Sequence, residues 1–213
     1  MKTTLLLVRH GQSLGNLREE FLGHTDLGLS PLGERQAETL VPRLADVAID
    51  VVYASDLCRA TDTVLPVARA HGLPVHPDAR LREIYAGVWE RMRFDDIAAI
   101  YPEERKLWKE NIGLACPTGG ERVADLLLRV RTALDELAAR HPGKTLLVGT
   151  HATPIRAITA QLRGYPPERM VEVPWAPNAS ITTVVYEDGV PHLDGEADAS
   201  HLEGMLTLVP KKI

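Results

Sequence analysis

The stretch Leu5-Leu6-Leu7-Val8-Arg9-His10-Gly11-Gln12-Ser13 decides how the rest of the chain is arranged. Its first four residues are apolar, which predicts a strand buried on both faces, because the run is too short for a helix. The run stops at Arg9 and His10, after which Gly11 permits a tight turn and Ser13 can cap a short helix. In an open α/β sheet, ligands bind beyond the carboxyl ends of the strands. We therefore expect Arg9 and His10 at that edge, where a guanidinium and an imidazole can handle an anion.

Outward from this stretch, strand and helix patterns alternate along the chain. Further strand patterns lie at 49–53, 75–77, 145–149 and 180–186, and an Asp188-Gly189 turn after the last predicts a hairpin. Helix patterns begin at the Ser30 cap with Pro31, at a Ser55-Asp56 cap, after Gly120, and at a Thr153 cap with Pro154. The alternation predicts an α/β fold with a doubly wound, mostly parallel sheet and helices on both faces. Two of the strands end in histidine, at His10 and His151.

Two segments are less regular. Pro42 lies inside the first helical pattern, so that helix either kinks or ends there. The segment at about 85–120 combines tryptophans, tyrosines and mixed charges, and we expect it to form a helical lid or insertion near a site. Residues 1–213 are otherwise consistent with a single domain.

Composition excludes several classes of partner. The net charge is −5 and no basic tract occurs, so a nucleic-acid partner is not expected. The apolar run at the N-terminus is too short for a signal-peptide core or a membrane span. Cys58 and Cys116 are too few for a disulfide framework, which favours free thiols in the cytoplasm. No metal-ligand spacing is present, so no metal and no cofactor are expected. A homodimer stays open as the oligomeric state.

Six blocks in order resemble the histidine phosphatase superfamily, in its phosphoglycerate-mutase-like branch. The first is LLLVRHGQSLGN at 5–16 and the second is LSPLG at 29–33, followed by Gln36-Ala37. The others are ASDLCRAT at 54–61, LREI at 81–84, GGE at 119–121 and VGTH at 148–151. The resemblance covers nearly the whole chain. Within the family, the sequence is most similar to the phosphatases that act on small metabolites.

The resemblance implies a set of site residues. His10 takes the phosphoryl group covalently, which suits a neutral imidazole because its free nitrogen is nucleophilic. Arginine forks suit the phosphate because they stay charged and grip two oxygens. The implied phosphate-pocket residues are Arg9, Arg59 and His151, and the implied substrate-binding residues are Asn16, Gly11, Ser13, Gly23 and Ala152. Further candidates for substrate contacts are Tyr85, His24, Arg105 and Lys109.

Glu83 matches the position of the family's proton donor. A leaving alkoxide needs a proton, and a carboxyl group can supply it and later activate water. The alternative is a structural glutamate that forms a salt bridge with Arg80 or Arg82. Three departures from the family pattern, Arg91, Ala152 and Thr153, stand where glycine is usual, and we expect them to affect the fit of the substrate.

Three functions compete at this point. The first is a metal-independent phosphomonoesterase acting on a small phosphorylated metabolite through phosphohistidine. The second is a cofactor-dependent phosphoglycerate mutase, which the short interval from Glu83 to Gly119 and the block Pro117–Glu121 disfavour. The third is a non-catalytic phosphate-binding module, which requires the loss of a catalytic residue, and none is missing.

Overall fold

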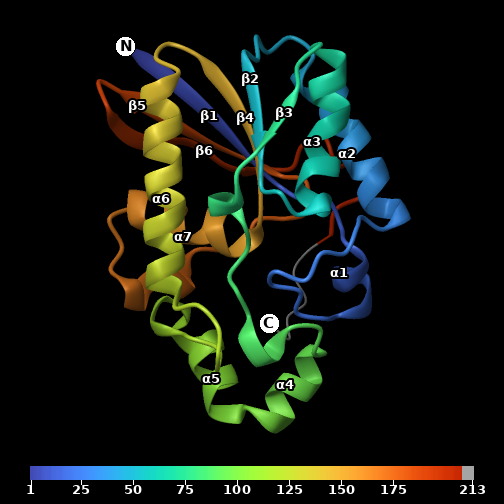
Figure 1. Ribbon diagram of the computed structural model, residues 1–213, viewed down its shortest axis with the longest axis vertical. Helices are drawn as coiled ribbons and strands as arrows, with labels where there is room; N and C mark the ends of the chain where they lie inside the picture. Colours follow the sequence, from blue (N-terminus) through green and yellow to red (C-terminus); the bar gives the residue numbers. More distant parts are fainter. Residues whose placement is uncertain (208–213) are drawn as a thin grey trace.

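One six-stranded sheet, in the order β3-β2-β4-β1-β5-β6, runs through the computed structural model, which describes residues 1–207 (Figure 1). The strands β1 to β4 are parallel, and β5 and β6 form an antiparallel hairpin at one edge. The prediction of a mostly parallel sheet is therefore confirmed. The strands are β1 (Lys2–Arg9), β2 (Val51–Ala54), β3 (Val75–Pro77), β4 (Thr145–Thr150), β5 (Ile181–Glu187) and β6 (Val190–Asp198).

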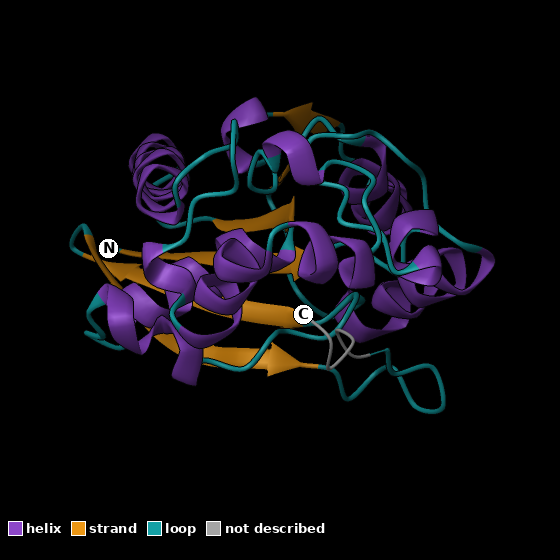
Figure 2. Ribbon diagram, turned by 90° about the horizontal axis from the view of Figure 1, so that it is seen from below, coloured by secondary structure: helices purple, strands orange, loops and turns teal. Residues whose placement is uncertain are grey.

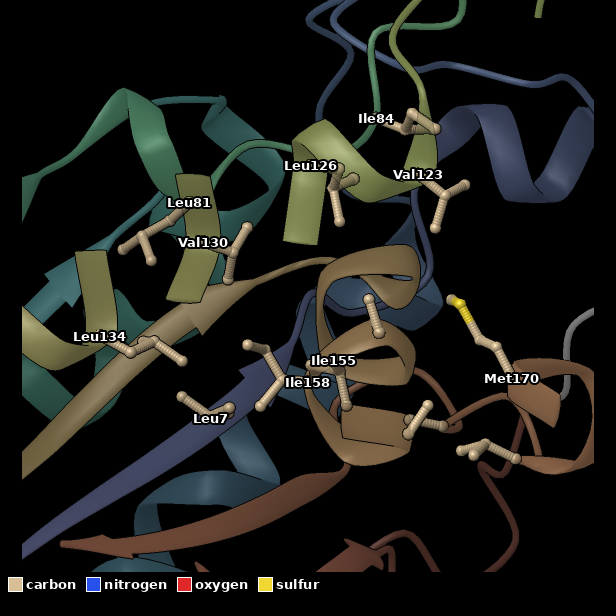
Figure 3. Close-up of a cluster of buried hydrophobic side chains, with 14 of the residues drawn as sticks. Leu7, Leu81, Ile84, Val123, Leu126, Val130, Leu134, Ile155, Ile158 and Met170 are labelled. Atoms are coloured by element: carbon tan, nitrogen blue, oxygen red, sulfur yellow. The ribbon is translucent and has the colours of Figure 1, made fainter. Parts of the chain in front are cut away.

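Helices cover both faces of the sheet, as Figure 2 shows from below. On one face lie α2 (Pro31–Leu44) and α3 (Cys58–Ala70), and on the other lie α6 (Val123–Arg140) and α7 (Ala152–Leu162). Side chains of β1 alternate between the two cores because successive residues of a strand point to opposite faces. Leu7 packs with α6 and α7 (Figure 3), and Leu5 belongs to the same cluster. Leu6 and Val8 pack with α2 and α3. This explains the unbroken apolar run in β1.

The first two helices follow the start signals that the sequence carries. The Ser13 hydroxyl accepts from the Asn16 amide and caps α1 (Leu14–Arg18). Ser30 accepts from the Gly33 amide and caps α2, with Pro31 at the first helical position. The helix α2 continues past Pro42 to Leu44, so it does not end at the proline.

Two predicted caps are wrong. The helix α3 begins at Cys58 with Leu57 at its N-cap, and Oδ1 of Asp26 accepts from the Cys58 amide at 2.8 Å. The Ser55 hydroxyl lies before the helix, 2.8 Å from Nε2 of His151 and 3.4 Å from the Leu57 amide. The helix α7 begins at Ala152, so His151 itself is the N-cap residue and Thr153 lies in the first turn.

The irregular segment forms short helices at the end of the molecule opposite the N-terminus (Figure 1). These are α4 (Phe94–Ile100) and α5 (Pro102–Glu110), with 3₁₀ turns at Gly87–Trp89 and Ile112–Leu114. Two more 3₁₀ turns lie at Ala79–Leu81 and Pro167–Glu172. Trp89 and Trp108 are buried and meet edge to face with ring centroids 5.7 Å apart, which ties the segment together. Across residues 1–207, no helix is both long enough and apolar enough to cross a bilayer.

Candidate active site

The register of the sheet brings the two strand-end histidines together. Arg9 of β1 is paired with Thr150 of β4, so His10 and His151 leave adjacent strand ends in the same direction. Their rings meet edge to face with centroids 5.2 Å apart, and both side chains are buried. Two residues 141 positions apart in sequence thus form one site at the carboxyl edge of the sheet.

The backbone carbonyl of Gly11 determines which nitrogen of the His10 ring carries the hydrogen. Its Nδ1 atom lies 2.7 Å from the carbonyl oxygen of Gly11, and a carbonyl can only accept, so Nδ1 carries the hydrogen. In the neutral ring, Nε2 therefore holds the free lone pair. Burial, together with the positive charges of Arg59 and Arg9, lowers the pKa of His10 well below its ordinary value. The imidazole is consequently neutral and nucleophilic at pH 7.

The loop after β1 is held from three sides. The Gly11 amide donates to Oγ1 of Thr63 at 2.9 Å, and Nδ2 of Asn178 donates to the His10 carbonyl at 3.0 Å. A Cβ on Gly11 would lie 2.6 Å from the carbonyl oxygen of Gly33. Gly11 does not have the positive φ of a left-handed turn. The predicted reason for this glycine, a tight turn, is therefore wrong, because close approach of two backbones requires it.

Two buried arginines flank His10, each anchored through backbone carbonyls. Arg59, in the first turn of α3 as predicted, donates to the carbonyls of Thr25 at 2.9 Å and Gly23 at 2.7 Å. Arg9 donates to the carbonyl of Ala176 at 2.6 Å. Burial lowers the pKa of Arg9 to about 10 and also lowers that of Arg59, yet both remain charged at pH 7. The site therefore concentrates positive charge away from water.

Three polar atoms at this place have no hydrogen-bond partner within residues 1–207. They are Nε of Arg9, Nε of Arg59 and Nδ1 of His151, and all three are buried. Buried polar atoms are ordinarily paired, so an unpaired group of this kind calls for an explanation. A phosphate dianion supplies acceptor oxygens and negative charge at once, which complements the two guanidinium N–H groups of Arg9 and Arg59.

Glu83 lies in the segment that follows the 3₁₀ turn Ala79–Leu81, and its side chain contacts the first turn of α7. Its Oε1 accepts from the amide of Ile84 at 2.8 Å, and its Oε2 accepts from the amide of Thr153 at 3.3 Å. The alternative role as a salt-bridge partner is not realised in the structure. Arg80 pairs with Asp78 and Glu136, and Arg82 pairs with Asp56.

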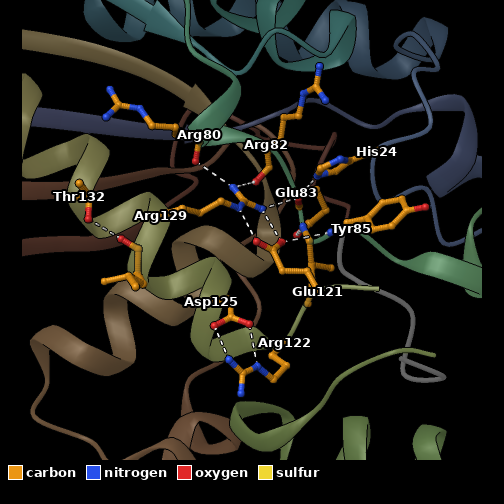
Figure 4. Close-up of polar contacts among 12 residues, drawn as sticks. His24, Arg80, Arg82, Glu83, Tyr85, Glu121, Arg122, Asp125, Arg129 and Thr132 are labelled. Atoms are coloured by element: carbon orange, nitrogen blue, oxygen red, sulfur yellow. Dashed lines mark hydrogen bonds and ion pairs between the residues drawn. The ribbon is translucent and has the colours of Figure 1, made fainter. Parts of the chain in front are cut away.

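Arg129, on α6, holds the segment that carries Glu83 (Figure 4). Its guanidinium donates to the carbonyls of Arg80, Arg82 and Glu83, each at 2.8 Å, and forms a two-point ion pair with Glu121. Sequence reasoning missed this residue. The available signal was an arginine on a helix whose neighbours Leu126 and Val130 belong to the apolar face.

Asn16 and Ser13 form a reciprocal capping box at α1. Oδ1 of Asn16 accepts from the Ser13 amide at 3.1 Å and from Nδ2 of Asn178 at 3.2 Å. This arrangement occupies the oxygen of Asn16 and leaves its Nδ2 as the group that can donate to a ligand.

One cavity opens onto these residues. The predicted site residues that line it are Arg9, His10, Ser13, Asn16, Gly23, Arg59, Glu83 and Ala152. Gly11 and His151 do not line it, although both contact His10. Thr153, which the sequence marked as a departure from the family pattern, lines the cavity too. Phe94 and Trp108 also line it and belong to the segment 85–120 that we expected near a site. The sequence did not indicate the remaining wall residues, which are Glu20, Phe21, Leu22 and Trp175. The further candidates Tyr85, His24, Arg105 and Lys109 lie outside it.

Comparison with known proteins gives one consistent family. Residues 5–199 match the family model of the histidine phosphatase superfamily (branch 1). The phosphoserine phosphatase 1 of Hydrogenobacter thermophilus is 36% identical over 75% of this chain and 76% of its own length. A probable phosphoglycerate mutase of Yersinia enterocolitica is 33% identical over 93% of this chain and 94% of its own. The solved structure of a mycobacterial glucosyl-3-phosphoglycerate phosphatase superposes with a TM-score of 0.83, at 30% identity, covering 92% of this chain and 98% of that one.

Proposed function

The chain belongs to the histidine phosphatase superfamily, and we propose on this premise that it is a phosphatase that hydrolyses small phosphorylated metabolites through a phosphohistidine on His10. The observation that carries the proposal is the 2.7 Å contact between Nδ1 of His10 and the Gly11 carbonyl. It leaves the Nε2 lone pair of the neutral ring available in a cavity lined by Arg9 and Arg59. A nucleophile and the charges that hold its target are thus adjacent.

In the first step, Nε2 of His10 forms a bond to phosphorus as the bond from phosphorus to the ester oxygen breaks. Arg9 and Arg59 stabilise the charge on the phosphoryl oxygens. The Glu83 carboxyl group gives its proton to the departing alkoxide, which leaves as an alcohol.

In the second step, the Glu83 carboxylate takes a proton from water. The water oxygen bonds to phosphorus, and the bond between phosphorus and Nε2 breaks. Inorganic phosphate and neutral His10 are the products, so the cycle closes without any further reactant.

A phosphoglycerate mutase is the second candidate. The match over 93% of this chain to a protein named as a probable mutase supports it. The matches to phosphatases, together with the short interval between Glu83 and Gly119, support hydrolysis. The two differ in the fate of the phosphoryl group, which a mutase returns to its substrate.

The proposal includes independence from metal ions, because Arg9 and Arg59 supply the stabilising charge. Chelator treatment should therefore leave activity intact, and vanadate, which adopts the five-coordinate geometry of phosphoryl transfer, should inhibit. The proposal also retains a small-molecule substrate rather than a nucleic acid, in line with the net charge of −5. Location in the cytoplasm is part of the same proposal, supported by the free thiols of Cys58 and Cys116.

The test is a screen of phosphomonoesters that follows free phosphate, with 3-phosphoglycerate and a bisphosphorylated primer included to detect the 2-isomer. We expect phosphate release to exceed isomer formation. Quenching in alkaline detergent during turnover should leave an acid-labile phosphoryl group on His10, and His10→Ala should abolish both labelling and turnover. Faster isomerisation would establish the mutase, and undiminished activity of His10→Ala would overturn the mechanism.

A further inference from the structure

Some residues that line the cavity differ in chemistry from those around His10. We call the part lined by Glu20, Phe94 and Trp108 the second half of the cavity, and the part around His10, Arg9 and Arg59 its phosphate end. Glu20, which follows α1, lines the same cavity as His10 and Arg59. Phe94 of α4 and Trp108 of α5 line it as well. An acidic side chain therefore stands among aromatic ones in a cavity that the cationic side chains of Arg9 and Arg59 also line.

The Glu20 carboxylate is poorly compensated. Its side chain is 15% exposed, and Oε2 is buried without a hydrogen-bond partner within residues 1–207. Nε of Arg91 lies 3.7 Å from Oε2, which is longer than a hydrogen bond, and the Arg91 side chain is 55% exposed. An ion pair with so exposed a partner is weak. A ligand that covers the cavity would remove the remaining water from this carboxylate, which is costly unless the ligand brings a compensating charge.

The aromatic walls around Glu20 are fixed in place. Trp108 is 2% exposed and packs edge to face on Phe21, with ring centroids 5.3 Å apart, and its indole N–H has no partner among the described residues. Trp175 carries the guanidinium of Arg156 at 4.2 Å from its ring centroid. Arg156 also donates to the carbonyls of Val171 and Val173, which ties this wall to its own loop.

We propose that this half of the cavity binds an alkylammonium group, so that the substrate is a phosphomonoester of an amino alcohol. The inference rests on the proposed phosphatase function and names its substrate class. Aromatic faces attract organic cations, and a nearby carboxylate adds direct charge compensation. A neutral polyol could hydrogen-bond to Glu20 but would leave its charge uncompensated in a covered cavity. A cation at one end and a phosphate at the other match the two charges that the cavity presents.

Phosphocholine and 3,3-dimethylbutyl phosphate are the matched probes, because the second has the same shape with carbon in place of the charged nitrogen. We expect kcat/KM of the wild-type enzyme to be about tenfold higher for phosphocholine. In Glu20→Gln, which keeps the size of the side chain and removes its charge, the ratio should fall toward one, to the part that the aromatic faces alone supply. Glu19→Gln is the matched control, because Glu19 pairs with Arg93 and does not line the cavity. Its ratio should equal that of the wild type.

Equal values for the two esters in the wild type, or an undiminished ratio in Glu20→Gln, would overturn the inference. Faster hydrolysis of glycerol 3-phosphate than of phosphocholine would assign this half to hydroxyl groups and would also overturn it. Failure of the proposed function has a different signature, namely no hydrolysis of any ester, including nitrophenyl phosphate. In that case calorimetric affinities of the two probes still decide the matter, since the inference requires tighter binding of phosphocholine and the loss of that difference in Glu20→Gln.

Discussion

The Nη2 atom of Arg129 donates to the backbone carbonyl of Glu83 at 2.8 Å (Figure 4). The same guanidinium reaches the carbonyls of Arg80 and Arg82, so it satisfies three backbone acceptors of the segment that ends at the proposed acid. Glu121 balances its charge through a two-point ion pair. Arg129 therefore holds the backbone that carries Glu83, and we infer that it positions this proposed acid.

Arg129→Ala should misplace Glu83 and lower kcat for an alkyl phosphate by on the order of 10²-fold. A nitrophenyl ester, whose leaving group needs no proton, should lose much less, and this difference is the signature of positioning. Arg129→Lys should restore little, because one ammonium cannot reach three carbonyls. The control is Arg122→Ala, which removes an exposed pair with Asp125 at the start of the same helix. Equal losses for the two esters would contradict the assignment.

Glu83→Gln tests the proposed acid itself. General acid assistance is worth roughly 10²–10⁴-fold, so phosphorylation of His10 by an alkyl phosphate should slow by that range in single-turnover experiments. The same step with nitrophenyl phosphate should be nearly unaffected. The glutamine keeps the shape of the side chain, and thermal unfolding should confirm that the fold is retained. If both esters slow alike, the acid has to be sought elsewhere in the cavity wall.

The lowered pKa values of His10 and His151 predict acid sensitivity of the fold. Burial is the first cause for both, so each ring is neutral when folded and takes a proton more readily when unfolded. Because the unfolded chain then binds more protons below pH 6.5, stability should be full above that pH and fall as the pH drops further. The slope can reach about 1.4 kcal/mol per pH unit for each histidine.

Chemical unfolding at a series of pH values between 7.5 and 5 measures this slope. His10→Gln and His151→Gln, which cannot take up a proton in this range, should each flatten it. His24 and His201 also have a lowered pKa and contribute to the wild-type slope, so the comparison is between variants. An unchanged slope in both variants would show that the two rings titrate alike in the folded and unfolded states.

Glu90 is expected to support the phosphate end through Arg59. Its carboxylate accepts from the amides of His24 and Thr25, both at 2.8 Å, and from the Thr25 hydroxyl. Those residues belong to the loop whose carbonyls hold Arg59. Glu90→Gln replaces one accepting oxygen by a donor, so the loop should loosen. We expect KM and the inhibition constant of inorganic phosphate to rise by about tenfold, with a smaller change in kcat.

Glu104→Gln is a matched control for that experiment. The Glu104 carboxylate likewise accepts from the amide and hydroxyl of a threonine, Thr118, but does not hold the loop that binds Arg59. Its kinetic constants should stay at wild-type values. Similar increases in both variants would indicate a general loss of rigidity rather than a specific effect on Arg59.

Local patterns in the sequence account for most of the fold. The unbroken apolar run of β1 predicted burial on both faces, and the Ser30-Pro31 pair located the start of α2. The cap prediction failed at Ser55, since α3 begins three residues later and the distant Asp26 accepts from its first amide. The structure places the Ser55 hydroxyl against His151, a contact made across 96 residues.

The sequence by itself determined the strand ends that carry His10 and His151, because apolar runs and the polar residues that end them are local features. Tertiary structure alone decided which nitrogen of His10 is free, since the Gly11 carbonyl selects it. It also decided that Arg129 supports Glu83 and that Glu20 shares a cavity with Trp108. Such relationships join residues far apart in the chain, and their physical cause is the packing of whole helices and loops, which no local spacing encodes.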